Sequence, residues 1–81
     1  MKKHLLLQLE KMRLVLGSNI DEIKGLVEAY KSIGLLIKSE LGNTEKDALE
    51  KVQQQIHTSI DSLVKETDNL YELYKAMVES L

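Results

Sequence analysis

The sequence predicts an all-α protein, a long antiparallel helical hairpin that pairs into a four-helix bundle. Its 81 residues include no Pro and are rich in Leu, Lys and Glu, a composition typical of long helices. Apolar residues recur at steps of three and four in both halves, as they do on one side of a helix. Between the halves, one short stretch carries residues that end one helix and begin the next. Residues 1–81 therefore form one domain, with helices expected over residues 2–41 and 44–81.

The turn is predicted at Leu41-Gly42-Asn43-Thr44. Gly tolerates the left-handed backbone that ends many helices, and Asn tolerates it next best. Thr44 is then expected to cap the second helix, with Asp47 completing an acidic variant of the capping box three residues later. Gly42, Asn43 and Thr44 are the predicted turn residues.

The first helix carries one apolar stripe, with steps of three, four and four from Leu9 to Ile20. Such an eleven-residue repeat locally relaxes a left-handed supercoil. Gly17-Ser18-Asn19 leaves two alternatives open, a continuous helix with a kink at Gly17 and a chain broken there into three helices. Continuity is favoured because the stripe stays in phase, and one interior Gly costs only about 1 kcal/mol relative to Ala. The stripe comprises Leu5, Leu9, Met12, Leu16, Ile20, Ile23, Val27, Tyr30, Ile37 and Leu41.

The second helix repeats this pattern, again with one four-four step, from Val52 through Ile56 to Ile60. A second apolar row of Val64, Tyr71 and Val78 runs beside it. The stripe comprises Leu49, Val52, Ile56, Ile60, Leu63, Thr67, Leu70, Tyr74, Met77 and Leu81.

Several apolar residues lie beside or beyond the stripes, where a single hairpin would leave them exposed. Together they would form a patch larger than the few hundred Å² typical of monomers. The sequence thus predicts a homodimer, a complex with a helical protein partner, or both. These residues are Leu6, Val15, Leu26, Leu36, Val64, Tyr71 and Val78.

The open end of the hairpin is predicted to carry recognition, because it is the most apolar and aromatic part of the second helix and no loop holds it. The alternative is that Leu70, Tyr74 and Met77 only join the two helices. The predicted interface is Leu6, Leu9, Leu26, Leu36, Val64, Leu70, Tyr71, Tyr74, Met77 and Val78.

Composition excludes several classes of function. The net charge of −2 with interspersed signs argues against nucleic acid as a partner. There is no Cys, and His4 and His57 are far apart, so no catalytic, cofactor or metal site is predicted. No apolar run is long enough to span a membrane, and the N-terminus does not match a signal peptide. We therefore predict a cytoplasmic protein that is not an enzyme.

Two long helices joined at Leu41-Gly42, with Ala48 opening the second stripe, resemble the small helical hairpins of type VII secretion. These are the Trp-x-Gly family and the accessory proteins that escort toxins with an N-terminal Leu-x-Gly domain. This chain has no Trp, and no Tyr- or Phe-x-x-x-Asp export signal. The resemblance implies a small adaptor or chaperone-like protein that binds helices of another protein, and export by a signal-peptide-independent route. The alternative is a phage- or plasmid-encoded regulator, inhibitor or immunity-type protein that blocks a host or toxin target through its acidic second half.

Overall fold

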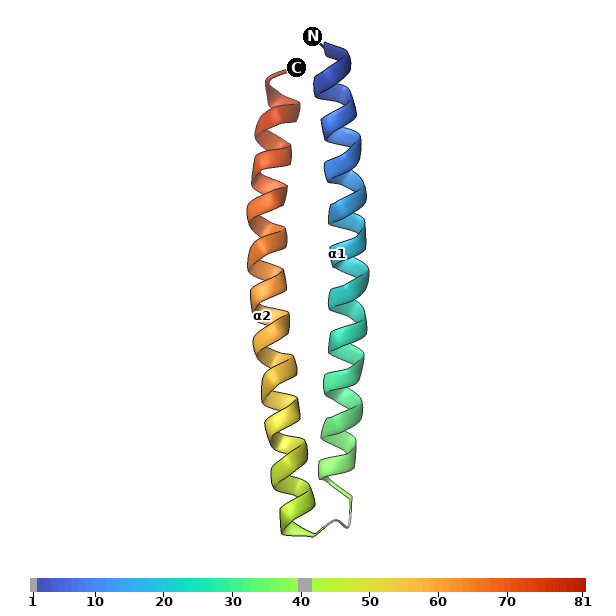
Figure 1. The fold of residues 1–81 in the computed structure, drawn as a ribbon, viewed down its shortest axis with the longest axis vertical. Helices are drawn as coiled ribbons and strands as arrows, with labels where there is room; N and C mark the ends of the chain where they lie inside the picture. The colour runs from blue at the N-terminus through green and yellow to red at the C-terminus, as the bar shows by residue number, and fades with distance from the viewer. Residues whose placement is uncertain (1, 40–41) are drawn as a thin grey trace.

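The computed structural model describes residues 2–39 and 42–81 and shows two helices. Helix α1 spans Lys2–Ile37 and α2 spans Asn43–Glu79. They lie side by side and antiparallel, with both termini at one end and the turn at the other (Figure 1). The hairpin measures 62 × 15 × 14 Å. Strands are absent from the described residues, and the predicted all-α helical hairpin is confirmed.

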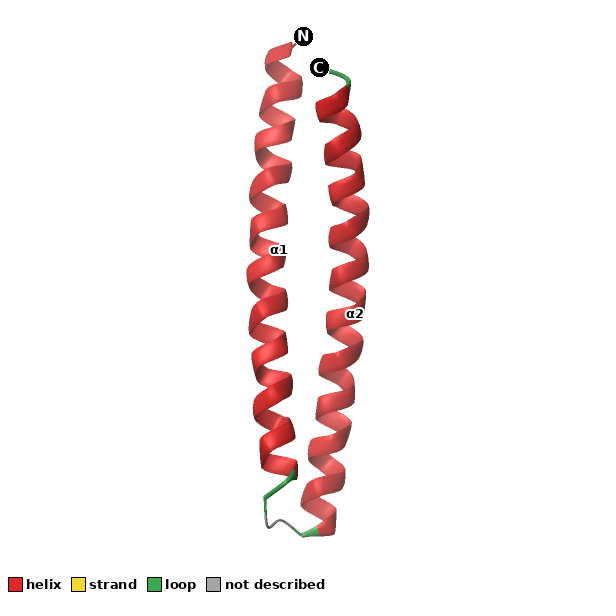
Figure 2. Ribbon diagram, turned by 180° about the vertical axis from the view of Figure 1, so that it is seen from behind, coloured by secondary structure: helices red, strands yellow, loops and turns green. Residues whose placement is uncertain are grey.

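Helix α1 runs without a break through Gly17-Ser18-Asn19 (Figure 2), so the three-helix alternative is wrong. The helix continues because residues on both sides of Gly17 pack against α2. Leu16 is buried there, and Asn19 and Ile23 are half-buried.

Two other glycines in α1 give a matched stability test. A Cβ at Gly25 would meet nothing within 4 Å, whereas a Cβ at Gly34 would lie 3.2 Å from the Gln53 Nε2 atom. Gly25→Ala is expected to raise the free energy of unfolding by about 1 kcal/mol, because Ala is the better helix former. Gly34→Ala should gain less, since the flexible Gln53 side chain must move. Urea unfolding followed by circular dichroism measures both, and a loss of stability in Gly25→Ala would contradict the exposed, helical placement of that residue.

The turn differs from the prediction in its local geometry. Helix α1 ends at Ile37, and the Ser39 amide and hydroxyl both donate to the Leu36 carbonyl, at 3.0 and 2.5 Å. These bonds satisfy a terminal carbonyl without a left-handed residue. Gly42 has φ −67° and ψ 158°, an extended conformation, and is itself the N-cap residue of α2. The predicted left-handed role of Gly42 is therefore wrong, and Leu41 lies outside the described residues.

The predicted cap of α2 is also wrong, because α2 already begins at Asn43 and Thr44 lies inside its first turn. The Lys46 amide donates to the Gly42 carbonyl at 3.0 Å, so the helical hydrogen bonds start two residues earlier than a Thr44 cap would place them. Glu45 is the acidic residue of this first turn, where its charge favours the positive helix end. No Thr44 side-chain cap is needed for the helix to start.

The residues between the two helices, called here the seam, alternate steps of three and four throughout. This is the spacing of a left-handed coiled coil. The predicted eleven-residue repeats are wrong, because Asn19 and Gln53 occupy the seam where Ile20 and Val52 were expected. Ile20 and Val52 are 46% and 43% exposed. The seam comprises Leu5, Leu9, Met12, Leu16, Asn19, Ile23, Leu26, Tyr30, Ile33 and Ile37 of α1, and Lys46, Leu49, Gln53, Ile56, Ile60, Leu63, Thr67, Leu70, Tyr74 and Met77 of α2.

The seam encloses little core. Among the described residues only Leu9, Leu16 and Thr67 are buried, with exposed fractions of 6%, 9% and 9%, and none of these is completely enclosed. Two helices cover each other from one side only, so the remaining seam residues stay half-exposed. A single hairpin therefore lacks the enclosed core that stabilises most domains.

Candidate protein-interaction site

One long side of the hairpin, called here the apolar face, carries large apolar residues that no part of the described chain covers. Its members repeat at seven residues or multiples of seven on each helix, directly beside the seam. Their exposed fractions range from 38% to 53%. The apolar face comprises Leu6 and Ile20 of α1 and Val64, Tyr71 and Val78 of α2.

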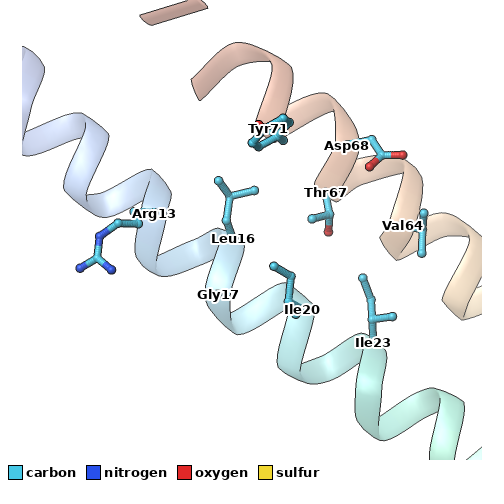
Figure 3. Close-up of a pocket in the computed structure, with 9 residues that line it drawn as sticks. All are labelled: Arg13, Leu16, Gly17, Ile20, Ile23, Val64, Thr67, Asp68 and Tyr71. Carbon is cyan, nitrogen blue, oxygen red and sulfur yellow. The ribbon is translucent and has the colours of Figure 1, made fainter. Parts of the chain in front are cut away.

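A groove of 570 Å³ runs along the apolar face between the helices. In Figure 3, Leu16 and Ile20 extend from α1 toward α2, and Thr67 extends from α2 toward α1. Gly17 adds no side chain to the α1 wall of the groove, and a Cβ at this position would meet no atom of α2 within 4 Å. The groove is lined by Arg13, Leu16, Gly17, Ile20, Ile23, Val64, Thr67, Asp68 and Tyr71. Its size and lining suit apolar side chains from another helix.

Thr67 places a polar atom in this apolar groove. Its hydroxyl oxygen is buried and has no hydrogen-bond partner in the described part of the chain. A buried polar group without a partner costs about 1–3 kcal/mol. Thr67 therefore weakens the hairpin at its middle.

Thr67→Val is expected to raise the free energy of unfolding by about 1 kcal/mol, because Val keeps the shape and removes the unpaired hydroxyl. Thr58→Val is the matched control. The exposed Thr58 hydroxyl donates to the Gln54 carbonyl at 3.1 Å, so its removal should change stability little. Chemical denaturation measures both variants, and equal effects at the two sites would contradict a burial cost specific to Thr67.

A second groove, of 500 Å³, lies nearer the turn on the same side of the hairpin. The Gln53 Nε2 atom donates to the Tyr30 carbonyl at 3.4 Å, and the rings of Tyr30 and His57 are 6.0 Å apart. These contacts fix the register between the helices. The lining residues are Tyr30, Lys31, Gly34, Leu35, Lys38 and Gln53.

The opposite side of the hairpin, called here the polar face, has a different character. Its groove of 310 Å³ is lined by Glu22, Leu26, Thr58, Ser59, Ser62, Leu63 and Glu66. Ser18, Gly25 and Ser32 of α1, and Ser39 just after its end, are spaced by seven and all exposed. Val15, Leu36 and Leu73 are also exposed on this side, but they are interspersed with hydroxyls and carboxylates, which are well solvated.

The predicted interface residues fall into three groups. Leu6, Val64, Tyr71 and Val78 lie exposed on the apolar face. Leu9 is buried in the seam, and Leu70, Tyr74 and Met77 are half-buried there, so they join the two helices. Leu26 lines the polar-face groove, and Leu36 is exposed fourteen residues after Glu22, on that same side.

Sequence reasoning missed Ile20 as a member of the apolar face, because it assigned Ile20 to the seam. It also missed the exposed Leu7, Leu14 and Leu35, which are 53%, 60% and 71% exposed. These three share one helical row on the back of α1, away from α2. A strict seven-residue repeat that starts at Leu9 predicts both features. It places Ile20 beside the seam and Leu14 on the side of α1 opposite the seam.

Ionic contacts at the site are local and exposed. The Arg13 Nε atom donates to the Glu10 Oε2 atom at 3.1 Å. This hydrogen bond and the charge of Arg13 hold the pKa of Glu10 below its ordinary value. A lowered carboxyl pKa stabilises the fold at neutral pH, and the contribution is lost as the pH falls through the lowered pKa. His57 Nδ1 and Asp61 Oδ2 lie 3.4 Å apart.

Two further structural features are absent from residues 2–39 and 42–81. No group of three or more His, Asp or Glu side chains there is arranged to hold a metal ion. Neither α1 nor α2 combines the length and apolarity of a membrane-spanning helix. No protein-family model, curated protein or solved structure matches the chain.

Proposed function

We propose that this protein is a non-enzymatic interaction module that covers its apolar face with helices from another chain. The supporting observation is the imbalance between a small buried seam and the exposed Ile20, Tyr71 and Val78. Covering these side chains recovers about 25 cal/mol for each Å² of apolar surface removed from water. Two more helices laid across the groove complete a four-helix bundle.

The most specific form of this proposal is a small adaptor or chaperone-like protein, such as an accessory protein of type VII secretion. In this role the open apolar face would shield the helices of a partner before they reach their final assembly. The apolar lining of the groove favours an amphipathic helix as the bound element.

The test is affinity capture from the source cell with the unmodified chain and a Tyr71→Glu, Val78→Glu double variant. We expect a helical protein encoded nearby to bind the unmodified chain and to be lost with the double variant. A Leu7→Glu, Leu14→Glu variant, changed on the back of α1, should still capture it. A partner that binds all three forms equally would contradict the assignment of the apolar face.

The alternative function, a small inhibitor or immunity-type protein, is favoured by one observation. Asp47, Asp61 and Asp68 form an exposed acidic row along α2, which suits a basic surface on a target. In that case Asp61→Asn with Asp68→Asn would abolish capture, whereas Tyr71→Glu with Val78→Glu would not. The two variants therefore separate the two functions.

A further inference from the structure

We propose that a second copy of this chain covers the apolar face, in a two-fold dimer whose turns lie at the same end. In this dimer α1 of each copy packs against α2 of the other. The inference rests on the proposed function, because it names the occupant of the same face. It is drawn from the charges along the margins of that face.

The α1 margin of the apolar face carries one row of exposed residues spaced by seven. The row is basic toward the turn, and Glu10, near the open end of the hairpin, is its one acidic member. Gly17, Lys31 and Lys38 line the two grooves, which places the row on this side of the molecule. In chain order it reads Lys3, Glu10, Gly17, Lys24, Lys31 and Lys38.

The α2 margin carries a second row with the opposite pattern. It is acidic along most of its length and basic at the open end. Asp68 lines the larger groove, so this row borders the same face from the other side. In chain order it reads Asp47, Gln54, Asp61, Asp68 and Lys75, all exposed.

The register makes the two rows complementary in charge at three heights. The Gln53 Nε2 atom donates to the Tyr30 carbonyl and lies 3.2 Å from where a Cβ of residue 34 would be. Residues of the two helices therefore lie at the same height where their numbers sum to about 85. Glu10 is then level with Lys75, Lys24 with Asp61, and Lys38 with Asp47. Gln54 and Gly17 supply neutral partners at the two remaining heights. Within one hairpin these rows lie on opposite margins of the face and do not meet.

A two-fold axis along the hairpin brings the rows together. Such an axis keeps every residue at its own height and sets the α1 margin of one copy against the α2 margin of the other. Glu10 then faces Lys75 of the second copy, Lys24 faces Asp61, and Lys38 faces Asp47. The two-fold symmetry forms each of these contacts twice. The reversed dimer, with turns at opposite ends, sets α2 against α2 and brings Asp61 and Asp68 of the two copies together. Like charges placed across an interface select against that arrangement.

The area is sufficient for a stable dimer. The face extends along a hairpin 62 Å long and 15 Å wide, and a standard interface takes roughly 800 Å² from each partner. The apolar face and its grooves form the centre of this contact, and the two charged rows form its rim. This is the arrangement of specific protein interfaces.

The orientation is tested by the distance between spin labels on the two copies. The chain has no Cys, so Thr44→Cys gives one label per copy beside the turn. The proposed dimer places the two labels only a bundle width apart, about 20–35 Å, since packed helices lie roughly 10 Å from each other. The reversed dimer places them near the full hairpin length of 62 Å. Asp21→Cys, halfway along α1, is the control that gives a similar short distance in both arrangements.

The charge complementarity is tested by mixing two variants, Lys24→Glu with Lys38→Glu and Asp47→Lys with Asp61→Lys. Each variant alone opposes like charges in its homodimer, whereas the mixed dimer opposes unlike charges at every changed position. We expect mixed dimers to exceed the statistical proportion by about tenfold, since each exposed pair contributes a fraction of a kcal/mol. Glu28→Lys mixed with Lys65→Glu, two changes on the backs of the helices, should give the statistical mixture.

These outcomes separate the dimer arrangement from the proposed function. A long Thr44 distance in an intact dimer, or a statistical mixture of the charge variants, overturns the arrangement and leaves an interaction module. A monomer that still captures a helical partner overturns the second copy as occupant. A monomer that captures nothing overturns both proposals.

Discussion

Replacing Tyr71 and Val78 together with Glu is expected to convert an associated, helical protein into a largely unfolded monomer at micromolar concentration. The two side chains are 52% and 42% exposed in the hairpin, so the change acts on association, and the separated hairpin unfolds because it encloses little core. In an assembled bundle they would be enclosed. An unpaired charge buried there costs about 3–5 kcal/mol, so we expect at least a thousandfold weaker association. Light scattering and circular dichroism measure mass and helicity separately.

The control for this experiment lies on the back of α1. Leu7 and Leu14 are also about half-exposed, at 53% and 60%, and Leu7→Glu with Leu14→Glu removes similar apolar surface. Association should survive that change. If the Tyr71 and Val78 variant associates as strongly as the unmodified chain, the apolar face is ordinary surface and the proposed function is wrong.

Leu16→Ala is expected to reduce the free energy of unfolding by about 2–3 kcal/mol, because it removes a buried side chain from the centre of the seam. Leu16 is only 9% exposed and forms part of the groove floor. Domains of this size have free energies of unfolding of roughly 4–12 kcal/mol, so this one substitution removes a large part of the total stability. Urea unfolding followed by circular dichroism gives the loss directly.

The same substitution at Leu14 supplies the comparison, since that side chain lies on the same helix and is 60% exposed. Leu14→Ala should change the free energy of unfolding by less than about 0.5 kcal/mol. If both substitutions cost the same, Leu16 does not sit in the seam, and the register derived from the Gln53 and Tyr30 contact is wrong.

The sequence was sufficient to predict the hairpin, because helical periodicity over nearly forty residues is a strong signal and the chain has no Pro. It was not sufficient to predict the phase of the seam. Local reasoning selected the more apolar neighbour, Ile20 over Asn19 and Val52 over Gln53. The packed pair of helices instead keeps a constant seven-residue spacing and accepts polar residues to do so. The phase of the seam is set by packing along the full length of both helices. It therefore cannot be read from a short segment of the sequence.

The turn and the interface show the same limit. Helix α2 can start at Asn43 or at Thr44 with similar cost, since the first amides of a helix lack intrahelical partners in either case. Val64, Tyr71 and Val78 were recognised beside the stripe because their spacing of seven is visible in the sequence. The sequence pattern groups Val15 and Leu36 with them although both lie on the other side of the hairpin, because only the seam phase separates the two sides.

The most direct test of the proposed assembly is the molar mass of the unmodified chain in solution, measured by light scattering together with its helicity. We predict twice the chain mass of 9.2 kDa at micromolar concentration, with helicity falling as dilution separates the copies. A mass of 9.2 kDa with full helicity retained would contradict the prediction, because it would show that one hairpin is stable with its apolar face open to water.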